Sequence, residues 1–266
     1  MLGYTDQLGN ELRLAKKPQR IVSLVPSQSE LLWDLGLREE LVGITKFCVH
    51  PQQLFSSTLR VGGTKKLDMD KIRALAPDVI IGNKEENERA QIEVLQAEFP
   101  VWMSDIYTFE DIFGMIRSMG EIFDKQTIAA NMILKLQTSL SCIKNYFVKQ
   151  QLAYFIWNAP YMFAARNTFI DHVLTHVGFE NALSAFDRYP SLDNKALQSV
   201  APEICFLSSE PFPFKDKHVK ALQKILPHTK ILIVDGEVFS WYGSRLLHLE
   251  EYLNKLAKHH PELLNR

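Results

Sequence analysis

The sequence has few cysteines, no long apolar run and almost no net charge, and each absence excludes a class of protein. Three cysteines in 266 residues (Cys48, Cys142 and Cys205) are too few and too widely spaced for a disulfide framework, so we expect free thiols. No apolar run approaches the roughly 18–20 residues that a membrane-spanning helix needs. Thirty basic and 31 acidic side chains leave a formal charge of −1, which argues against a protein that binds nucleic acid or anionic lipid.

The first residues of the chain also lack a secretory pattern. No basic stretch is followed by an apolar one, so we expect no signal peptide in this sequence. Two interpretations stay open, namely that the protein stays in the cytoplasm or that a signal has been removed. Hydrophobic residues make up 46% of the chain and charged residues 23%, which is typical of a soluble globular protein. The length predicts two lobes of about 100–130 residues each.

Short apolar segments alternate with amphipathic helical segments in both halves of the chain. This alternation predicts parallel βαβ units, with both faces of each sheet covered by helices. After the first strand, Ser27 is predicted to cap a helix, with Glu30 completing a capping box and Gly36 ending the helix. The predicted strands are 20–24, 41–44, 78–81, 101–103, 152–157, 203–207 and 230–234.

The middle of the chain is helical. Apolar residues recur at intervals of three and four from Phe109 to Phe123 and again from Ile128 to Phe147. A helix of about 20 residues spans about 30 Å, enough to join two lobes. We therefore expect an N-terminal α/β lobe over 1–107, a helical connector over 108–149, and a C-terminal α/β lobe over 150–266.

The two halves contain a similar segment. Residues 75–81 (LAPDVII) match residues 200–206 (VAPEICF) at a constant offset of 125 positions. In both, a helix ends before a proline and an acidic residue opens a buried strand. The match favours two similar lobes.

These segments resemble those of a known family. Residues 21–30, the Val61–Gly63 stretch with residues 67–78, residues 158–181 and residues 239–245 are similar, in order and spacing, to the periplasmic binding proteins with a helical backbone. These proteins are the cobalamin-, haem- and iron-siderophore-binding components of ABC importers, and the cobalamin-binding branch is the most similar. The resemblance covers residues 20–257. It implies two α/β lobes joined by one long helix, with the ligand held in a cleft between them.

The resemblance also implies what the protein does. Members of the family capture a metal chelate and deliver it to a permease, without catalysis and with no intrinsic cofactor. We therefore expect a monomeric substrate-binding protein for cobalamin or a related corrinoid first, and for an iron-siderophore or haem second. The family implies a periplasmic or envelope location, whereas the missing signal leaves a cytoplasmic one open.

Docking on the permease involves one carboxylate on each lobe in this family. Asp70 stands at the first-lobe position, and the offset of 125 leads to Lys195 in the second lobe. A cation at Lys195 would repel an arginine on the permease, so the symmetric arrangement is broken. The aromatic residue that the resemblance to the corrinoid branch implies before Asp68 is replaced by Thr64–Lys66, which is a departure from that branch.

Ligands of open α/β sheets bind beyond the carboxyl ends of the strands, so the loops there hold the candidate site residues. Cys48 and His50, two positions apart, could hold a metal through a thiolate and an imidazole, or be a half-buried cysteine and a loop histidine. Phe47 opens the same loop and is a candidate ligand contact. The amide of Asn83 could also contact the ligand, although a surface loop would look the same.

Lys65 and Lys66 follow Gly63 and could bind a propionate, phosphate or carboxylate, although a solvated turn accounts for them equally well. Trp241 and Tyr242 lie beside Gly243 in a loop without helical spacing, so we expect them to form an apolar wall for the ligand. Arg245 could pair with an acidic ligand group or simply begin the last helix. Tyr189 is a further ligand-binding candidate.

Two alternatives to a transport protein stay open. One is a cytoplasmic carrier or sensor with the same cleft, which Lys195 and the missing signal favour. The other is an α/β metal-dependent enzyme, for which Cys48 with His50 is the only compact pair of reactive groups. The motifs of nucleotide-binding loops, nucleophile elbows and zinc peptidases are absent from the sequence.

Overall fold

The computed structural model describes residues 2–264 and forms two compact α/β units. Unit 1 comprises Met1–Leu136 and Tyr242–Arg245, and unit 2 comprises Gln137–Trp241 and Leu246–Arg266. The boundary falls within helix α6 (Gln126–Cys142), which contributes to both units. The sequence predicted that all of 150–266 belongs to the second lobe, whereas residues 242–245 belong to unit 1. Within residues 2–264, no helix is both long and apolar enough to cross a membrane.

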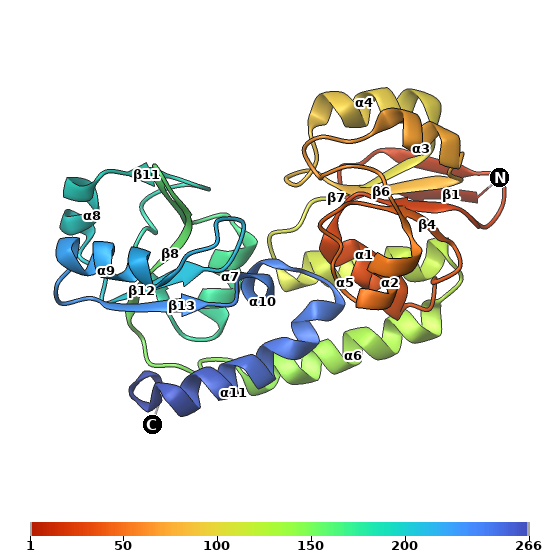
Figure 1. The fold of residues 1–266 in the computed structure, drawn as a ribbon. Coiled ribbons are helices and arrows are strands. Elements are labelled where there is room, and N and C mark those ends of the chain that lie inside the picture. The colour runs from red at the N-terminus through yellow and green to blue at the C-terminus, as the bar shows by residue number, and fades with distance from the viewer. Residues whose placement is uncertain (1, 265–266) are drawn as a thin grey trace. The chain divides into compact units, whose positions relative to one another are not determined.

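Unit 1 is built on a parallel five-stranded sheet of order β5-β4-β3-β6-β7 (Figure 1). All five residues of β6 are buried, as expected for a strand covered on both faces. Helices α3 and α4 lie on one face, and α1 and α5 lie on the other (Figure 1). The elements of unit 1 are β1 (Leu2–Thr5), β2 (Glu11–Leu14), β3 (Ile21–Ser23), α1 (Pro26–Asp34), β4 (Leu41–Ile44), α2 (Gln52–Ser57), β5 (Leu59–Arg60), α3 (Met69–Leu75), β6 (Val79–Asn83), α4 (Arg89–Glu98), β7 (Val101–Ser104) and α5 (Phe109–Ile122).

The start of α1 corrects one prediction. Ser27 is not the N-cap, because the helix begins at Pro26 and its N-cap residue is Val25, which makes no side-chain cap. Proline suits the first position of a helix because its fixed φ is already helical and it has no N–H to leave unpaired. Gly36 follows the helix with a φ of +81°, which agrees with the predicted end.

Unit 2 contains a sheet of order β11-β9-β8-β12-β13, with β10 paired to β8. Strands β8, β12 and β13 pair in parallel as predicted, and β10, which was not predicted, is also parallel to β8, but β9 is antiparallel to β8 and β11 is antiparallel to β9. Only Ala159 and Pro160 separate β8 from β9, and so short a connection permits only an antiparallel pair. The elements are β8 (Gln151–Asn158), β9 (Tyr161–Ala164), α7 (Phe169–His176), β10 (Glu180–Asn181), β11 (Ser191–Leu192), α8 (Asn194–Val200), β12 (Ile204–Ser208), α9 (Asp216–Ile225), β13 (Lys230–Val234), α10 (Gly236–Ser240), the 3-10 helix η1 (Ser244–His248, partly in unit 1), α11 (Leu249–His259) and the 3-10 helix η2 (Pro261–Leu263).

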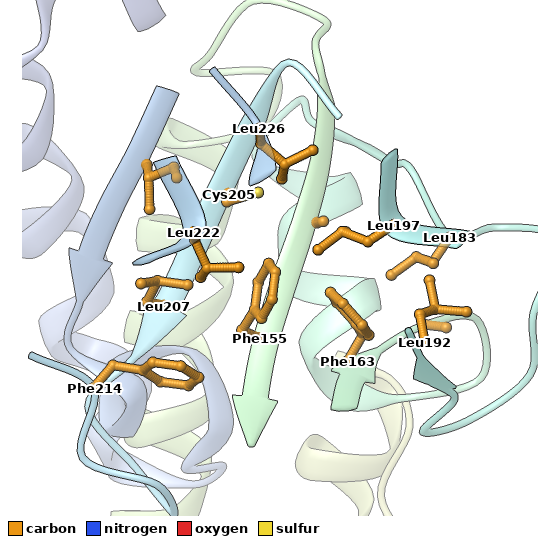
Figure 2. Packing of buried hydrophobic residues seen from close by; sticks show 13 residues of the cluster. Phe155, Phe163, Leu183, Leu192, Leu197, Cys205, Leu207, Phe214, Leu222 and Leu226 are labelled. Carbon is orange, nitrogen blue, oxygen red and sulfur yellow. The ribbon is translucent and has the colours of Figure 1, made fainter. Parts of the chain in front are cut away.

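The core of unit 2 lies between its sheet and helices α8 and α9. Phe155 of β8 and Phe163 of β9 are fully buried, with ring centroids 4.3 Å apart. Leu197 of α8 and Leu222 of α9 point toward them (Figure 2). This packing fixes the sheet from which the loops of the candidate site emerge.

The predicted repeat is present in the structure. Asp68 caps α3 through the Lys71 N–H, and Asp193 caps α8 through the Ala196 N–H. Each helix ends in a left-handed alanine, Ala76 (φ 42°) in unit 1 and Ala201 (φ 46°) in unit 2. The two segments thus share their sequence pattern, their caps and their backbone conformation.

We predict that glycine at either left-handed alanine stabilises the protein. The left-handed conformation costs a non-glycine residue about 1–2 kcal/mol, and the extra freedom of glycine in the unfolded chain costs about 0.5–1 kcal/mol. Ala76→Gly and Ala201→Gly should therefore each raise the free energy of unfolding by about 0.5–1 kcal/mol, measured by urea denaturation. Ala130→Gly, at an exposed position inside α6, is the control and should lower it by about 1 kcal/mol. Equal losses in all three variants would contradict the prediction.

Candidate functional site

The strands of the unit 1 sheet all run in the same direction, so the loops that follow them gather at one edge. At this edge lies an open pocket of about 650 Å³. Phe47, predicted as a ligand contact, lines the pocket with 49% of its side chain exposed. The ammonium group of Lys46 lies 5.0 Å from the centroid of the Phe47 ring. The other lining residues are Gly62, Gly63, Thr64, Lys65, Lys66, Leu67, Asp68, Met69 and Asp70.

The turn that carries Lys65 and Lys66 is held by hydrogen bonds from Gln91 of α4 and from Asn87, which lies just before that helix. The Asn87 amide donates to the carbonyl of Thr64 (3.2 Å), and the Gln91 amide donates to the carbonyl of Lys65 (2.9 Å). The same Gln91 side chain accepts the N–H of Leu67 (2.8 Å). Asn87 also donates to the carbonyl of Leu24 after β3, which ties two loops of this edge together. The turn is therefore fixed rather than a freely solvated loop.

Asn83 was predicted to contact the ligand, but its side chain is only 2% exposed. Its amide donates to the Ser104 hydroxyl (2.9 Å), and its carbonyl oxygen accepts the N–H groups of Glu85 and Glu86. The residue thus shapes the loop after β6. Next to it, the ammonium group of Lys84 lies 2.6 Å from the Asp105 carboxylate, which raises the pKa of Lys84.

Cys48 and His50 were predicted as a metal pair. The thiol of Cys48 is fully buried and lies 3.1 Å from the Ser29 hydroxyl and 3.2 Å from the Thr45 hydroxyl. Burial raises the pKa of this thiol, which disfavours the thiolate that a metal requires. His50 is half-buried. Among residues 2–264, no group of three or more potential metal ligands is present.

Arg245 forms an ion pair with Glu30 within unit 1. Its guanidinium contacts both oxygens of the Glu30 carboxylate, with Nε 2.9 Å from Oε2 and Nη2 2.7 Å from Oε1. The Arg245 and Glu30 side chains are 13% and 10% exposed. Burial raises the pKa of Glu30, and the positive charge of Arg245 acts in the opposite direction. The pair anchors Tyr242–Arg245 in unit 1, where Tyr242 itself is 7% exposed.

Unit 2 presents an aromatic surface that the sequence analysis missed. Trp157, at the carboxyl end of β8, is 40% exposed, and its ring meets that of Phe212 edge to face at a centroid distance of 5.5 Å. Phe212 follows β12 and also packs against Phe214 at 4.9 Å. Strands β8 and β12 are parallel, so both aromatic residues lie at the carboxyl edge of the sheet. Two features of the sequence could have indicated these residues. Trp157 is an aromatic residue at the end of an apolar strand, and the strand that ends before residue 209 is followed by alternating prolines and phenylalanines at 211–214.

Trp241 was predicted as part of an apolar wall, but it is only 7% exposed. Its indole N–H donates to Oε1 of Glu210 (2.7 Å), which also accepts a hydrogen bond from Ser240 (2.9 Å). Trp241 thus fixes the start of the loop that carries Phe212. Tyr189, the remaining candidate of unit 2, is half-buried, and the Arg188 guanidinium lies 5.4 Å from its ring centroid.

Asp70 and Lys195 occupy equivalent positions in the repeat. Each is the second residue of its helix, α3 or α8, and follows the aspartate cap by two positions. The Asp70 side chain is 95% exposed and lies 3.2 Å from Arg73. Lys195 is exposed as well. The two units therefore present opposite charges at the same place in the fold.

Comparisons with known proteins identify the class. The family model of the periplasmic binding proteins matches residues 21–228. The vitamin B12-binding protein of Vibrio campbellii is 25% identical over 195 residues, which are 71% of this chain and 70% of the relative. The ABC transporter substrate-binding lipoprotein YvrC of Bacillus subtilis, described as uncharacterised, is 20% identical over 91% of this chain and 81% of its own.

Among solved structures, a periplasmic haem-binding protein from Pseudomonas aeruginosa superposes with a TM-score of 0.74. It is 23% identical, and the match covers 92% of this chain and 94% of that one. Because the family model matches most of the chain, this protein belongs to the periplasmic binding protein family. The predicted fold class, with two α/β lobes, is thereby confirmed.

Proposed function

We propose that this chain is the substrate-binding component of an ABC-type importer and that its ligand is a metal chelate. The observation that carries the proposal is a large exposed aromatic side chain at the carboxyl edge of each sheet, Phe47 in unit 1 and Trp157 in unit 2. This edge is where open α/β sheets bind ligands, and flat aromatic rings suit a macrocycle. Relatives named for vitamin B12 and haem support a corrinoid first, and haem or an iron-siderophore second.

The proposal includes capture without catalysis and delivery to a permease. Cys48, on which the enzyme alternative depends, is a buried thiol whose pKa is raised. The relatives described as periplasmic and as a lipoprotein support a location in the cell envelope. A permease that docks on both helices α3 and α8 would have to present a cation to Asp70 and an anion to Lys195.

Calorimetric titration of the full chain with cyanocobalamin, cobinamide, haem and ferrioxamine B tests the proposal. We expect a Kd below 1 μM for at least one of these chelates. Trp157→Ala should weaken that binding by about two- to twelvefold, because an aromatic contact contributes about 0.5–1.5 kcal/mol.

Trp33→Ala is the matched control. Trp33 is half-buried near the far end of α1, away from the carboxyl edge, where the Arg38 guanidinium lies 4.8 Å from its ring. This substitution should leave the affinity unchanged. Absence of binding to all four chelates would overturn the proposal.

A further inference from the structure

Three lysines line the pocket at the carboxyl edge of unit 1, namely Lys46, Lys65 and Lys66. Among the described residues, no carboxylate forms an ion pair with any of the three ammonium groups. The Lys65 ammonium donates instead to the backbone carbonyl of Glu85, and the Glu86 carboxylate acts on Lys65 only from a greater distance. The pocket therefore presents positive charge to whatever enters it.

Of the two carboxylates that line the same pocket, Asp68 is neutralised by Lys71, whereas Asp70 is 95% exposed and shares Arg73 with Glu98. Asp68 caps α3 and lies 2.9 Å from the ammonium group of Lys71. Asp70 lies 3.2 Å from the Arg73 guanidinium. Charge clustered in a concave surface attracts the opposite charge more strongly than the same groups do on a flat one.

The backbone that carries Lys65 and Lys66 is also held in place before a ligand arrives. Lys65 and Lys66 belong to the Gly63–Lys66 turn, whose backbone is bound by Asn87 and Gln91. Gly63 fits beneath Phe47 and Lys46, because a Cβ there would lie 3.2 Å from the Phe47 ring and 3.3 Å from Lys46 Cε. A fixed turn loses little conformational freedom on binding, which favours affinity.

We infer that this pocket binds an anionic oxygen group of the ligand, a carboxylate or a phosphate, while the ring of Phe47 contacts the apolar part. The inference rests on the proposed function and narrows it, because it selects the anionic members among the metal chelates.

The test uses three probes that separate the source of the anion. Haem carries two carboxylates, haem dimethyl ester carries neither, and cyanocobalamin carries one phosphodiester. Each is titrated into the wild-type chain, the Lys65→Gln/Lys66→Gln double variant and a Lys217→Gln/Lys220→Gln control. The control lysines are exposed on α9 of unit 2, and their substitution removes the same net charge without changing the lining of the pocket.

We expect the Lys65→Gln/Lys66→Gln variant to bind haem or cyanocobalamin about tenfold more weakly than the wild type, since two partly exposed ionic contacts are lost. The control variant and the dimethyl ester should show no such loss, and the difference should shrink as salt is added. A loss confined to haem identifies a carboxylate, and a loss confined to cyanocobalamin identifies the phosphodiester.

Unchanged affinities in the double variant, together with a loss in Trp157→Ala, would overturn this inference and leave the proposed function intact. Equal wild-type affinity for haem and its dimethyl ester, with cyanocobalamin unaffected by the lysines, would overturn it as well. If ferrioxamine B is the one chelate that binds, the inference is also overturned, because ferrioxamine B has neither a carboxylate nor a phosphodiester. Absence of binding to every chelate would instead overturn the proposed function, and the inference with it.

Discussion

Replacing Arg245 with methionine is expected to lower the free energy of unfolding by about 3–5 kcal/mol. The guanidinium contacts both oxygens of the Glu30 carboxylate, and both side chains are nearly buried. Methionine fills a similar volume but leaves a carboxylate without its cation in a poorly solvated place. The loss is measured by urea denaturation at neutral pH, where Glu30 must either stay charged and buried or take up a proton.

The control for this prediction is a surface pair. Arg13 lies 2.6 Å from Glu11, but both side chains are more than two-thirds exposed. Arg13→Met should therefore cost less than about 1 kcal/mol. The double variant Glu30→Leu/Arg245→Met should recover much of the loss, because no buried charge is left. Equal losses for Arg13→Met and Arg245→Met would show that burial does not matter here.

The pH dependence of Arg245→Met follows from the same contact. Burial raises the pKa of Glu30, and Arg245 opposes the rise, so removal of Arg245 should raise the pKa of Glu30 further. A carboxyl group whose pKa is higher in the folded than in the unfolded protein favours folding at low pH. This contribution is lost as the pH rises through the folded-state value. The variant should therefore lie closer to the wild type at acidic pH than at neutral pH, in denaturation measured at both.

Replacing Trp241 with alanine is expected to cost about 3–5 kcal/mol of stability, whether or not a ligand is present. The indole is 7% exposed, and its N–H donates to Glu210, so alanine leaves a cavity and removes a hydrogen bond. Trp157→Ala, at a side chain 40% exposed, should cost less than about 1.5 kcal/mol. Denaturant unfolding of the two variants side by side checks the contrast.

This contrast changes how binding data should be interpreted. A weaker affinity in Trp241→Ala would not show contact with the ligand, because the loop that carries Phe212 would also have lost its support at Glu210. Trp241→Phe keeps most of the ring and should cost only about 1–3 kcal/mol. Full stability in Trp241→Ala would contradict the structural role assigned to this residue.

The class of fold and seven of the strands were predicted from the sequence, whereas β1, β2, β5, β9, β10 and β11 were not. Strands β4 and β13 match their predicted bounds, because a short apolar run between two helical segments is typical of a strand in a parallel sheet. The repeat around Asp68 and Asp193 was also visible, since the same cap and the same proline break recur at a fixed offset. The antiparallel β9 was missed because its pairing depends on a two-residue connection, not on its own pattern.

The candidate site was less predictable, because burial of a loop side chain depends on distant residues. Trp241 was predicted to be part of an exposed apolar wall. It is buried instead, and its hydrogen-bond partner Glu210 is 31 positions away in the sequence. The partner of Arg245 is 215 positions away, and no local pattern points to it. The Gly63–Lys66 turn was located correctly, but its fixation by Asn87 and Gln91 required the structure.

The pairing of Glu30 with Arg245 has a consequence for biosynthesis. At about 5–20 residues per second, a ribosome adds Arg245 roughly 10–40 s after Glu30, since the two are 215 positions apart. In the nascent chain, the acidic side chain of Glu30 in unit 1 therefore lacks its partner while most of unit 2 is translated. An expression plasmid that ends at Leu136 would omit Tyr242–Arg245 and yield a fragment lacking part of its own domain. The first lobe therefore still lacks four of its own residues when most of the second lobe has already been translated.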